Sequence, residues 1–130
     1  MQHPAIIVLD TNFALIPGQL GVDIYREFER ICTQPYTLWV VAQTIDELRA
    51  IQTQGNTKEA KAARVALALF ENNHVKVAQI SASSADDAIV AYAKQNSCMV
   101  ATQDRELKEK LVSIQVRLIV LRQQKYLVMV

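Results

Sequence analysis

The sequence has few of the residues that mark extracellular, membrane-bound or repetitive proteins. Its 130 residues include only two cysteines, three glycines and three prolines. The two cysteines, Cys32 and Cys98, lie among apolar residues, and their spacing indicates neither a disulfide framework nor a zinc site. No apolar run is long enough to cross a bilayer, and the first residues lack the regions of a secretory signal. We therefore expect a cytoplasmic protein in a reducing setting, with no membrane contact.

Length and composition predict a single domain over residues 1–130. This length is near the commonest domain size, and hydrophobic residues make up 51% of the chain, enough for a core. The scarcity of glycine and proline leaves no stretch that indicates a linker or a low-complexity tract. The formal net charge of +1 neither favours nor excludes a nucleic-acid partner, because a neutral protein can carry a local basic patch.

Short apolar runs alternate with segments of helical periodicity. Pro17, Gly18 and Gly21 mark a loop. We predict strands at residues 6–9, 36–41, 75–80, 98–101 and 116–121, and helices at 22–31, from 44, from 57, at 86–95 and at 104–112. This alternation predicts an α/β fold with three layers, α/β/α, around a central parallel sheet of about five strands.

Residues 126–130 form an apolar tail, Tyr-Leu-Val-Met-Val. Three interpretations are open: an edge strand, a contact between two copies of the chain, or a docking segment. Because a free apolar end is unusual in a soluble monomer, the tail favours self-association and hence a homodimer.

Four acidic positions follow the ends of strand-like runs. They are Asp10, Glu47, Asp86 (with Asp87 beside it) and Asp104. In an open α/β sheet, the C-terminal ends of the strands form one rim where ligands bind, so these residues are expected to meet. Carboxylates about 4 Å apart repel by about 4 kcal/mol at an effective dielectric near 20. Without a cation, at least one pKa should rise.

A cluster of carboxylates at such a rim is suited to a hard divalent cation. A metal ion can polarise a phosphoryl oxygen, lower the pKa of an attacking water and stabilise a leaving oxygen. These properties indicate a metal-dependent phosphodiesterase that uses one or two ions, Mg²⁺ or Mn²⁺.

Each acid also has a purely structural interpretation. Glu47 fits a capping box with Thr44. Asp86, Asp87 and Asp104 fall in first helical turns, where acids stabilise the helix dipole. Asp10 is harder to explain this way, because a carboxylate that directly follows a buried strand needs a partner for its charge.

Together, these residues resemble the motifs of PIN-domain nucleases. Residues 7–12 (Ile-Val-Leu-Asp-Thr-Asn) resemble the family's opening motif, and residues 41–48 (Val-Ala-Gln-Thr-Ile-Asp-Glu-Leu) resemble its second. Residues 85–89 (Ala-Asp-Asp-Ala-Ile) and 100–107 (Val-Ala-Thr-Gln-Asp-Arg-Glu-Leu) resemble the third and fourth. The stretch 85–107 looks most like archaeal relatives of the PIN proteins that process ribosomal RNA in the small-subunit processome. Toxins of the VapC type share the motifs.

The resemblance implies a PIN-like fold and an Mg²⁺- or Mn²⁺-dependent endoribonuclease. It carries over Asp10, Glu47, Asp86 and Asp104 as catalytic and metal-binding residues. Supporting hydrogen bonds would come from Thr11, Asn12, Asp87 and Thr102. The implied partners are an RNA substrate, a second copy of the chain, and either an antitoxin or a ribosome-assembly protein.

Basic residues near the motifs are candidate contacts for RNA phosphates. They are Arg105 and Lys108, which follow the fourth motif, and Lys58, Lys61 and Arg64 on the long helix. Arg105 is the strongest candidate because it adjoins the acids. The alternative is that these side chains form ordinary solvated helix faces.

Three hypotheses about function follow. The first is an endoribonuclease, with ribosomal RNA processing as its role. The second is a VapC-like toxin ribonuclease with a cognate antitoxin. The third is a PIN domain that binds RNA or protein without cleavage, which ranks last because all four acids are present.

Overall fold

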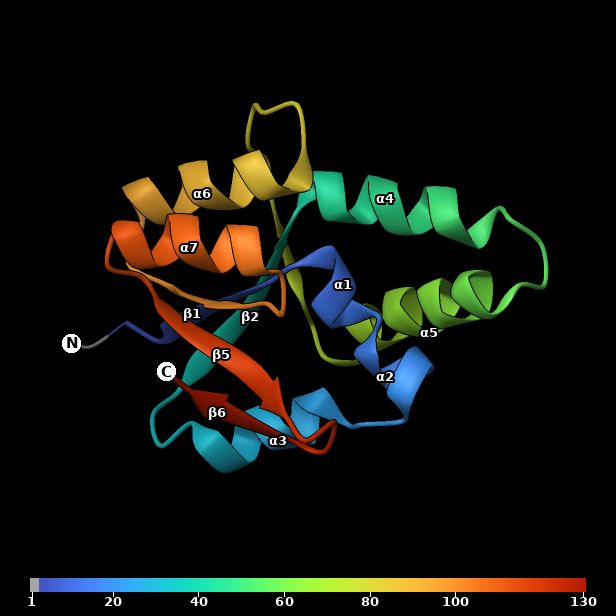
Figure 1. Ribbon diagram of the computed structural model, residues 1–130, viewed down its shortest axis with the longest axis horizontal. Helices are drawn as coiled ribbons and strands as arrows, with labels where there is room; N and C mark the ends of the chain where they lie inside the picture. The colour runs from blue at the N-terminus through green and yellow to red at the C-terminus, as the bar shows by residue number, and fades with distance from the viewer. Residues whose placement is uncertain (1–2) are drawn as a thin grey trace.

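A six-stranded sheet forms the centre of the fold (Figure 1). The computed structural model describes residues 3–130. The strands are β1 (Ala5–Leu9), β2 (Tyr36–Val41), β3 (Lys76–Ala78), β4 (Met99–Ala101), β5 (Arg117–Arg122) and β6 (Tyr126–Met129). Their order is β3-β2-β1-β4-β5-β6. The first five are parallel, and β6 runs antiparallel to β5. The predicted α/β class is therefore confirmed, with one antiparallel strand added.

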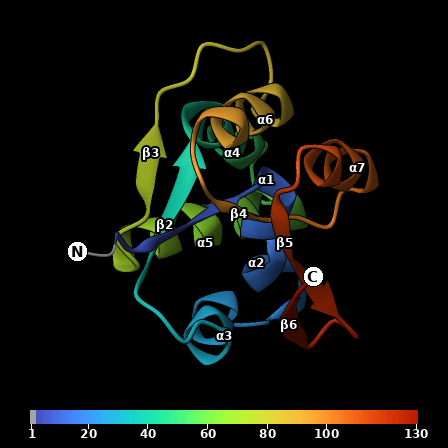
Figure 2. The ribbon, with the colours of Figure 1, turned by 90° about the vertical axis from the view of Figure 1, so that its left-hand side faces the viewer.

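Helices cover both faces of this sheet (Figure 2). They are α1 (Thr11–Ala14), α2 (Ile16–Leu20), α3 (Ile24–Ile31), α4 (Ala42–Gln52), α5 (Lys58–Asn72), α6 (Ala85–Gln95) and α7 (Arg105–Ser113). One core cluster contains Leu9 with residues of α1, α3 and α5, and the other contains Val8 with residues of α6 and α7. Strand β1 is thus buried on both sides, which explains its unbroken apolar sequence. Within residues 3–130, no helix is long and apolar enough to cross a membrane.

The loop predicted at Pro17 and Gly18 is wrong, because both residues lie in helix α2. Pro17 occupies the first turn, where its missing N–H has no helical partner to lose. Gly18 allows close packing: a Cβ added there would lie 2.6 Å from Cα of Ala62 on α5. Gly21 does mark a chain reversal, since it ends α2 with a left-handed φ of 70°.

The apolar tail forms the edge strand β6, and helix α3 covers its outer side. The Leu127 N–H donates to Oε1 of Glu27 at 2.9 Å, and Nη2 of Arg30 donates to the Leu127 carbonyl at 2.9 Å. Glu27 and Arg30 also pair with each other at 2.9 Å. This ion pair satisfies backbone groups that an edge strand would otherwise present to another chain.

The C-terminal ends of β1, β2 and β4 lead directly toward α1, α4 and α7. Figure 1 shows that the N-terminal ends of α4, α6 and α7 come together around α1. This rim is where the acidic residues lie.

Candidate active site

Asp10 lies at the centre of the rim, directly after β1, and is only 3% exposed. Its carboxylate is held on both oxygens. The Phe13 N–H donates to Oδ1 at 2.6 Å, which makes Asp10 the N-cap of α1. The Thr102 hydroxyl donates to Oδ2. Asp10 therefore has the polar partners that a buried carboxylate requires, but no basic side chain is among these hydrogen-bond donors.

Asp104 belongs to the turn that joins β4 to α7. Its N–H donates to Oγ1 of Thr102 at 3.0 Å, and its Oδ1 accepts from the Leu107 N–H at 2.8 Å as the N-cap of α7. Asp104 is thus a helix-end residue, but as the N-cap of α7 and not, as predicted, as an acid within the first turn. This role does not exclude a second one, because the cap uses only Oδ1.

Glu47 lies in the second turn of α4, which begins at Ala42 with Val41 as its N-cap. The capping-box interpretation of Glu47 is therefore wrong, since Thr44 is inside the helix. The Thr11 hydroxyl lies 3.0 Å from Oγ1 of Thr44 and 3.5 Å from Oε2 of Glu47. Thr44, which is fully buried, was not predicted in this supporting role. Its spacing of three residues from Glu47 puts both on one helix face and is the signal that could have found it.

The neighbouring acids Asp86 and Asp87 have different surroundings. Ser84 caps α6 by accepting from the Asp87 N–H at 3.1 Å. The Asp87 carboxylate accepts from the Ser83 hydroxyl at 3.3 Å and so supports the start of the helix. Asp86 instead contributes to the cavity between the helix ends.

That cavity has a volume of about 220 Å³ and is lined by Asp10, Thr11, Asn12, Glu47, Ser84, Ala85, Asp86 and Asp104. All four predicted acids thus line one space. A larger surface hollow of about 600 Å³ lies beside α3 and the end of α5. There Asp23 and Glu29 are accompanied by Arg26, so the hollow lacks a concentration of uncompensated negative charge. On chemical grounds the smaller cavity is the candidate active site.

Burial, together with neighbouring carboxylates, raises the pKa of Asp10, Glu47 and Asp86. Burial raises the pKa of Asp10 from 3.8 to about 6, and the charges of Asp86 and Asp104 add to this effect. The hydrogen bonds from Thr102 and the Phe13 N–H act against the rise. Burial and then Asp86 raise the pKa of Glu47, and burial and then Asp104 raise that of Asp86. The cavity therefore favours the uptake of positive charge, either protons or a cation.

The donor set consists of carboxylate and hydroxyl oxygens, the ligands of hard cations. Across residues 3–130, no group of three or more His, Cys, Asp or Glu side chains is arranged to hold a metal ion. An ion in this cavity would therefore contact few carboxylates directly and keep water as further ligands.

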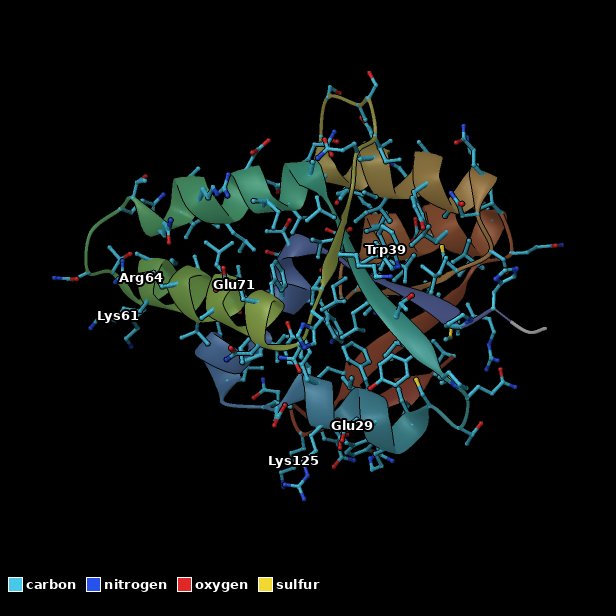
Figure 3. The ribbon with its side chains drawn as sticks, turned by 180° about the vertical axis from the view of Figure 1, so that it is seen from behind. Glu29, Trp39, Lys61, Arg64, Glu71 and Lys125 are labelled. Carbon is cyan, nitrogen blue, oxygen red and sulfur yellow. The ribbon has the colours of Figure 1, made fainter. Side chains whose placement is uncertain are left out.

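The basic residues predicted to contact RNA are not part of the cavity lining. Arg105 has a side chain that is 92% exposed and pairs with Glu109 at 3.4 Å. Arg64 donates to the carbonyls of Gln52 and Gly55. Figure 3 shows Arg64 with Lys61 at the end of α5 that adjoins the α4–α5 turn. Lys110, on α7, lowers the pKa of Asp86 through its charge.

Comparisons with known proteins bear on the family and the fold of the chain. Residues 7–124 match the family described as PIN like domain. Ribonuclease VapC4 of Methanocaldococcus jannaschii is 34% identical over 121 residues, or 92% of each chain. The structure of the PIN domain endonuclease Utp24 matches with a TM-score of 0.78 at 21% identity, over 94% of this chain and 89% of that one. A domain of a functionally unknown protein from M. jannaschii matches with a TM-score of 0.60 at 16% identity, over 91% of each chain. The two structural matches show similarity of fold.

Proposed function

The chain belongs to the PIN-like domain family, and on that premise we propose that it is a divalent-metal-dependent endoribonuclease that hydrolyses RNA phosphodiester bonds. The observation that carries the proposal is the presence of Asp10, Glu47, Asp86 and Asp104 around one cavity of about 220 Å³. The names of two similar proteins, a ribonuclease and an endonuclease, support the same chemistry.

The residues present fit Mg²⁺ or Mn²⁺. Asp10 is the best candidate for direct contact, because burial raises its pKa to about 6 and a cation would relieve the cost of its buried charge. Magnesium usually takes one or two carboxylates directly and retains water. This matches the arrangement of the acids in residues 3–130, where no three of them are grouped to hold one ion. A divalent ion bound here would polarise a phosphoryl oxygen and lower the pKa of an attacking water.

The chain's own residues then have distinct tasks. Thr102 and the Phe13 N–H fix the orientation of the Asp10 carboxylate. Thr11, backed by Thr44, orients Glu47. Because positioned carboxylates accept hydrogen bonds from water, Glu47, Asp86 and Asp104 can orient the water that attacks the phosphorus.

The RNA substrate has two candidates. Similarity of residues 85–107 to ribosomal-RNA-processing PIN proteins favours precursor ribosomal RNA, with a ribosome-assembly protein as partner. The 34% identity to Ribonuclease VapC4 over most of both chains favours a toxin with an antitoxin partner. Growth arrest on expression, relieved by co-expression of a neighbouring small protein, would select the toxin. We also propose a homodimer. The tail does not support it, because α3 covers the outer side of β6, so it rests on the resemblance to PIN-domain nucleases, and light scattering would test it.

The activity is tested with the Asp10→Asn variant. Purified wild-type protein in Mn²⁺ should cleave single-stranded RNA, and Asp10→Asn should lose cleavage by several orders of magnitude while keeping its circular dichroism spectrum. Asp46→Asn is a matched control, since Asp46 is an exposed acid on α4 outside the cavity lining. Cleavage by Asp10→Asn at the wild-type rate would overturn the site assignment.

A further inference from the structure

We propose that Gln43 and Gln103 are positioning residues for the RNA cleavage proposed above. Their side-chain amides fix the two loops that lead to Asp86 and Asp104. The expected effect on cleavage rests on the proposed function, whereas the hydrogen bonds that hold the two loops do not depend on it.

Gln43 joins helix α4 to the loop between β3 and α6. Its Nε2 donates to the Ile80 carbonyl at 2.6 Å and to the Ala82 carbonyl at 3.1 Å. That loop ends at Ser84, the N-cap of α6, two residues before Asp86. The amide therefore holds the chain just before the point where Asp86 enters the cavity.

The position of Gln43 on α4 connects two acids. Gln43 is four residues before Glu47, so both side chains lie on the same helix face. One turn of α4 thus carries Glu47 and the anchor for the loop of Asp86. A shift of this loop would change the separation of Glu47 and Asp86, although their sequence positions are 39 residues apart.

The Gln43 amide acts here only as a donor, because its Oε1 is buried without a hydrogen-bond partner among the described residues. Both of its partners are carbonyl oxygens, so the side chain must offer two N–H donors on one atom. A glutamate there would place a carboxylate against two acceptors, and a methionine would leave both carbonyls without their donor. The isosteric Gln43→Met change therefore removes the link with little change in volume.

Gln103 performs the corresponding task for the turn between β4 and α7. Its Nε2 donates to the Leu121 carbonyl at 3.1 Å, and its Oε1 accepts from the Leu121 N–H at 2.7 Å. This two-point contact resembles a backbone pairing and continues the β4–β5 ladder after β4 has ended at Ala101. Gln103 stands between Thr102 and Asp104, so the contact fixes the turn that carries both.

Neither glutamine is among the residues that line the acidic cavity. Both act through the backbone, so we expect an effect on turnover and metal affinity rather than on contact with RNA. Gln43 is partly buried, whereas Gln103 is exposed. The hydrogen bonds of both are partly buried, but more water reaches the Gln103 side chain and competes for its partners, so the Gln43 change should have the larger effect.

Hydrogen exchange of backbone amides tests the positioning without reference to activity. In Gln43→Met, the Asp87 N–H, which donates to Ser84, should exchange severalfold faster. In Gln103→Met, the Leu107 N–H, which donates to Asp104, should exchange severalfold faster. Gln95→Met is the control, because Gln95 is an exposed residue near the other end of α6. If the Leu121 amide alone responds to Gln103→Met, Gln103 does not position Asp104.

Kinetics then test the consequence. Loss of support behind metal-binding groups typically costs roughly 10- to 100-fold in activity or metal affinity. We expect kcat to fall by about tenfold or more in Gln43→Met and by less in Gln103→Met, with KM for RNA nearly unchanged. Mn²⁺ affinity, followed by thermal shift, should fall in parallel. Unchanged kcat and Mn²⁺ affinity in both variants would overturn the inference.

The outcomes separate this inference from the proposed function. If wild-type protein neither cleaves RNA nor binds Mn²⁺, the proposed function fails, and the exchange data alone decide whether the glutamines hold the loops. If a Met variant does not fold, Gln43→Asn and Gln103→Asn replace it. They keep the amide but shorten its reach, so they should shift exchange and kcat in the same direction. Folded Asn variants with wild-type exchange would refute the inference.

Discussion

The hydroxyl of Thr102 donates a hydrogen bond to the carboxylate of Asp10, 92 residues earlier in the chain. The contact exists because β1 and β4 are parallel neighbours in register, with Leu9 opposite Ala101. The two strands therefore end at the same level, and the residues that follow them, Asp10 and Thr102, meet. The same hydroxyl accepts from the Asp104 N–H at 3.0 Å, so Thr102 links two of the four acids.

Replacing Thr102 with valine should reduce both stability and activity. Thr102→Val keeps the shape but removes the donor to a buried carboxylate, a hydrogen bond typically worth about 1.5–3 kcal/mol. We expect the free energy of unfolding in urea to fall by about 2 kcal/mol, and cleavage to fall by about tenfold. Thr102→Ser retains the hydroxyl and serves as control. Equal stability of the Val and Ser variants would show that this hydrogen bond contributes nothing.

Stability of the metal-free protein should decrease as pH rises. Burial raises the pKa of Asp10 to about 6 from 3.8, so between these values the folded state binds more protons than the unfolded state. Unfolding free energy should therefore fall between pH 4 and pH 6, by about 3 kcal/mol at most from Asp10. Thermal unfolding in a chelator would measure this. The raised pKa values of Glu47 and Asp86 act in the same direction.

Two comparisons check that cause. Asp10→Asn should flatten the dependence, because the residue no longer titrates, and saturating Mn²⁺ should flatten it in wild-type protein, because a cation favours the carboxylate. A slope that is the same in wild type and Asp10→Asn would assign the effect to other groups.

The positions of the four acids were predictable from the sequence because parallel strands place their C-terminal ends on one rim. The apolar run 6–9 and the motif at 100–107 were sufficient to identify the two central strands and the residues after them. The family was likewise recognisable from four motifs in order. The prediction of a shared rim depends on strand direction, which short apolar runs and intervening helices reveal.

Other features depend on contacts between distant segments, which no local pattern specifies. The link between Thr11, Thr44 and Glu47 requires α1 to meet α4. Pro17 and Gly18 are in a helix because α2 packs against α5. The tail became an edge strand because Glu27 and Arg30 of α3 satisfy its outer backbone. In each case tertiary packing determined a feature that the local sequence either left open or predicted wrongly.

Adjacent acids on α4 offer a direct test of the cavity as a metal site. Glu47 lines the cavity, whereas its neighbour Asp46 does not. Mn²⁺ at a hundredfold excess over its dissociation constant should stabilise wild-type protein by about 2.7 kcal/mol. Glu47→Gln should weaken binding by about tenfold, which removes about 1.4 kcal/mol of that gain. Asp46→Asn should keep the full stabilisation by Mn²⁺. Equal Mn²⁺-induced thermal shifts in the two variants would contradict a role for Glu47 in metal binding.

Gly18 should tolerate no side chain, because α2 and α5 approach closely at this residue. A Cβ there would meet Cα of Ala62 at 2.6 Å and Cβ of Ala62 at 2.9 Å. We expect Gly18→Ala to lower the free energy of unfolding by about 1–3 kcal/mol, as overpacking does. Adding Ala62→Gly should restore only part of the loss, since the nearer contact is with the backbone. Urea unfolding of both variants would measure this. An unchanged free energy of unfolding in Gly18→Ala would contradict the close-packing argument. It would mean that α2 can move away from α5 at little cost.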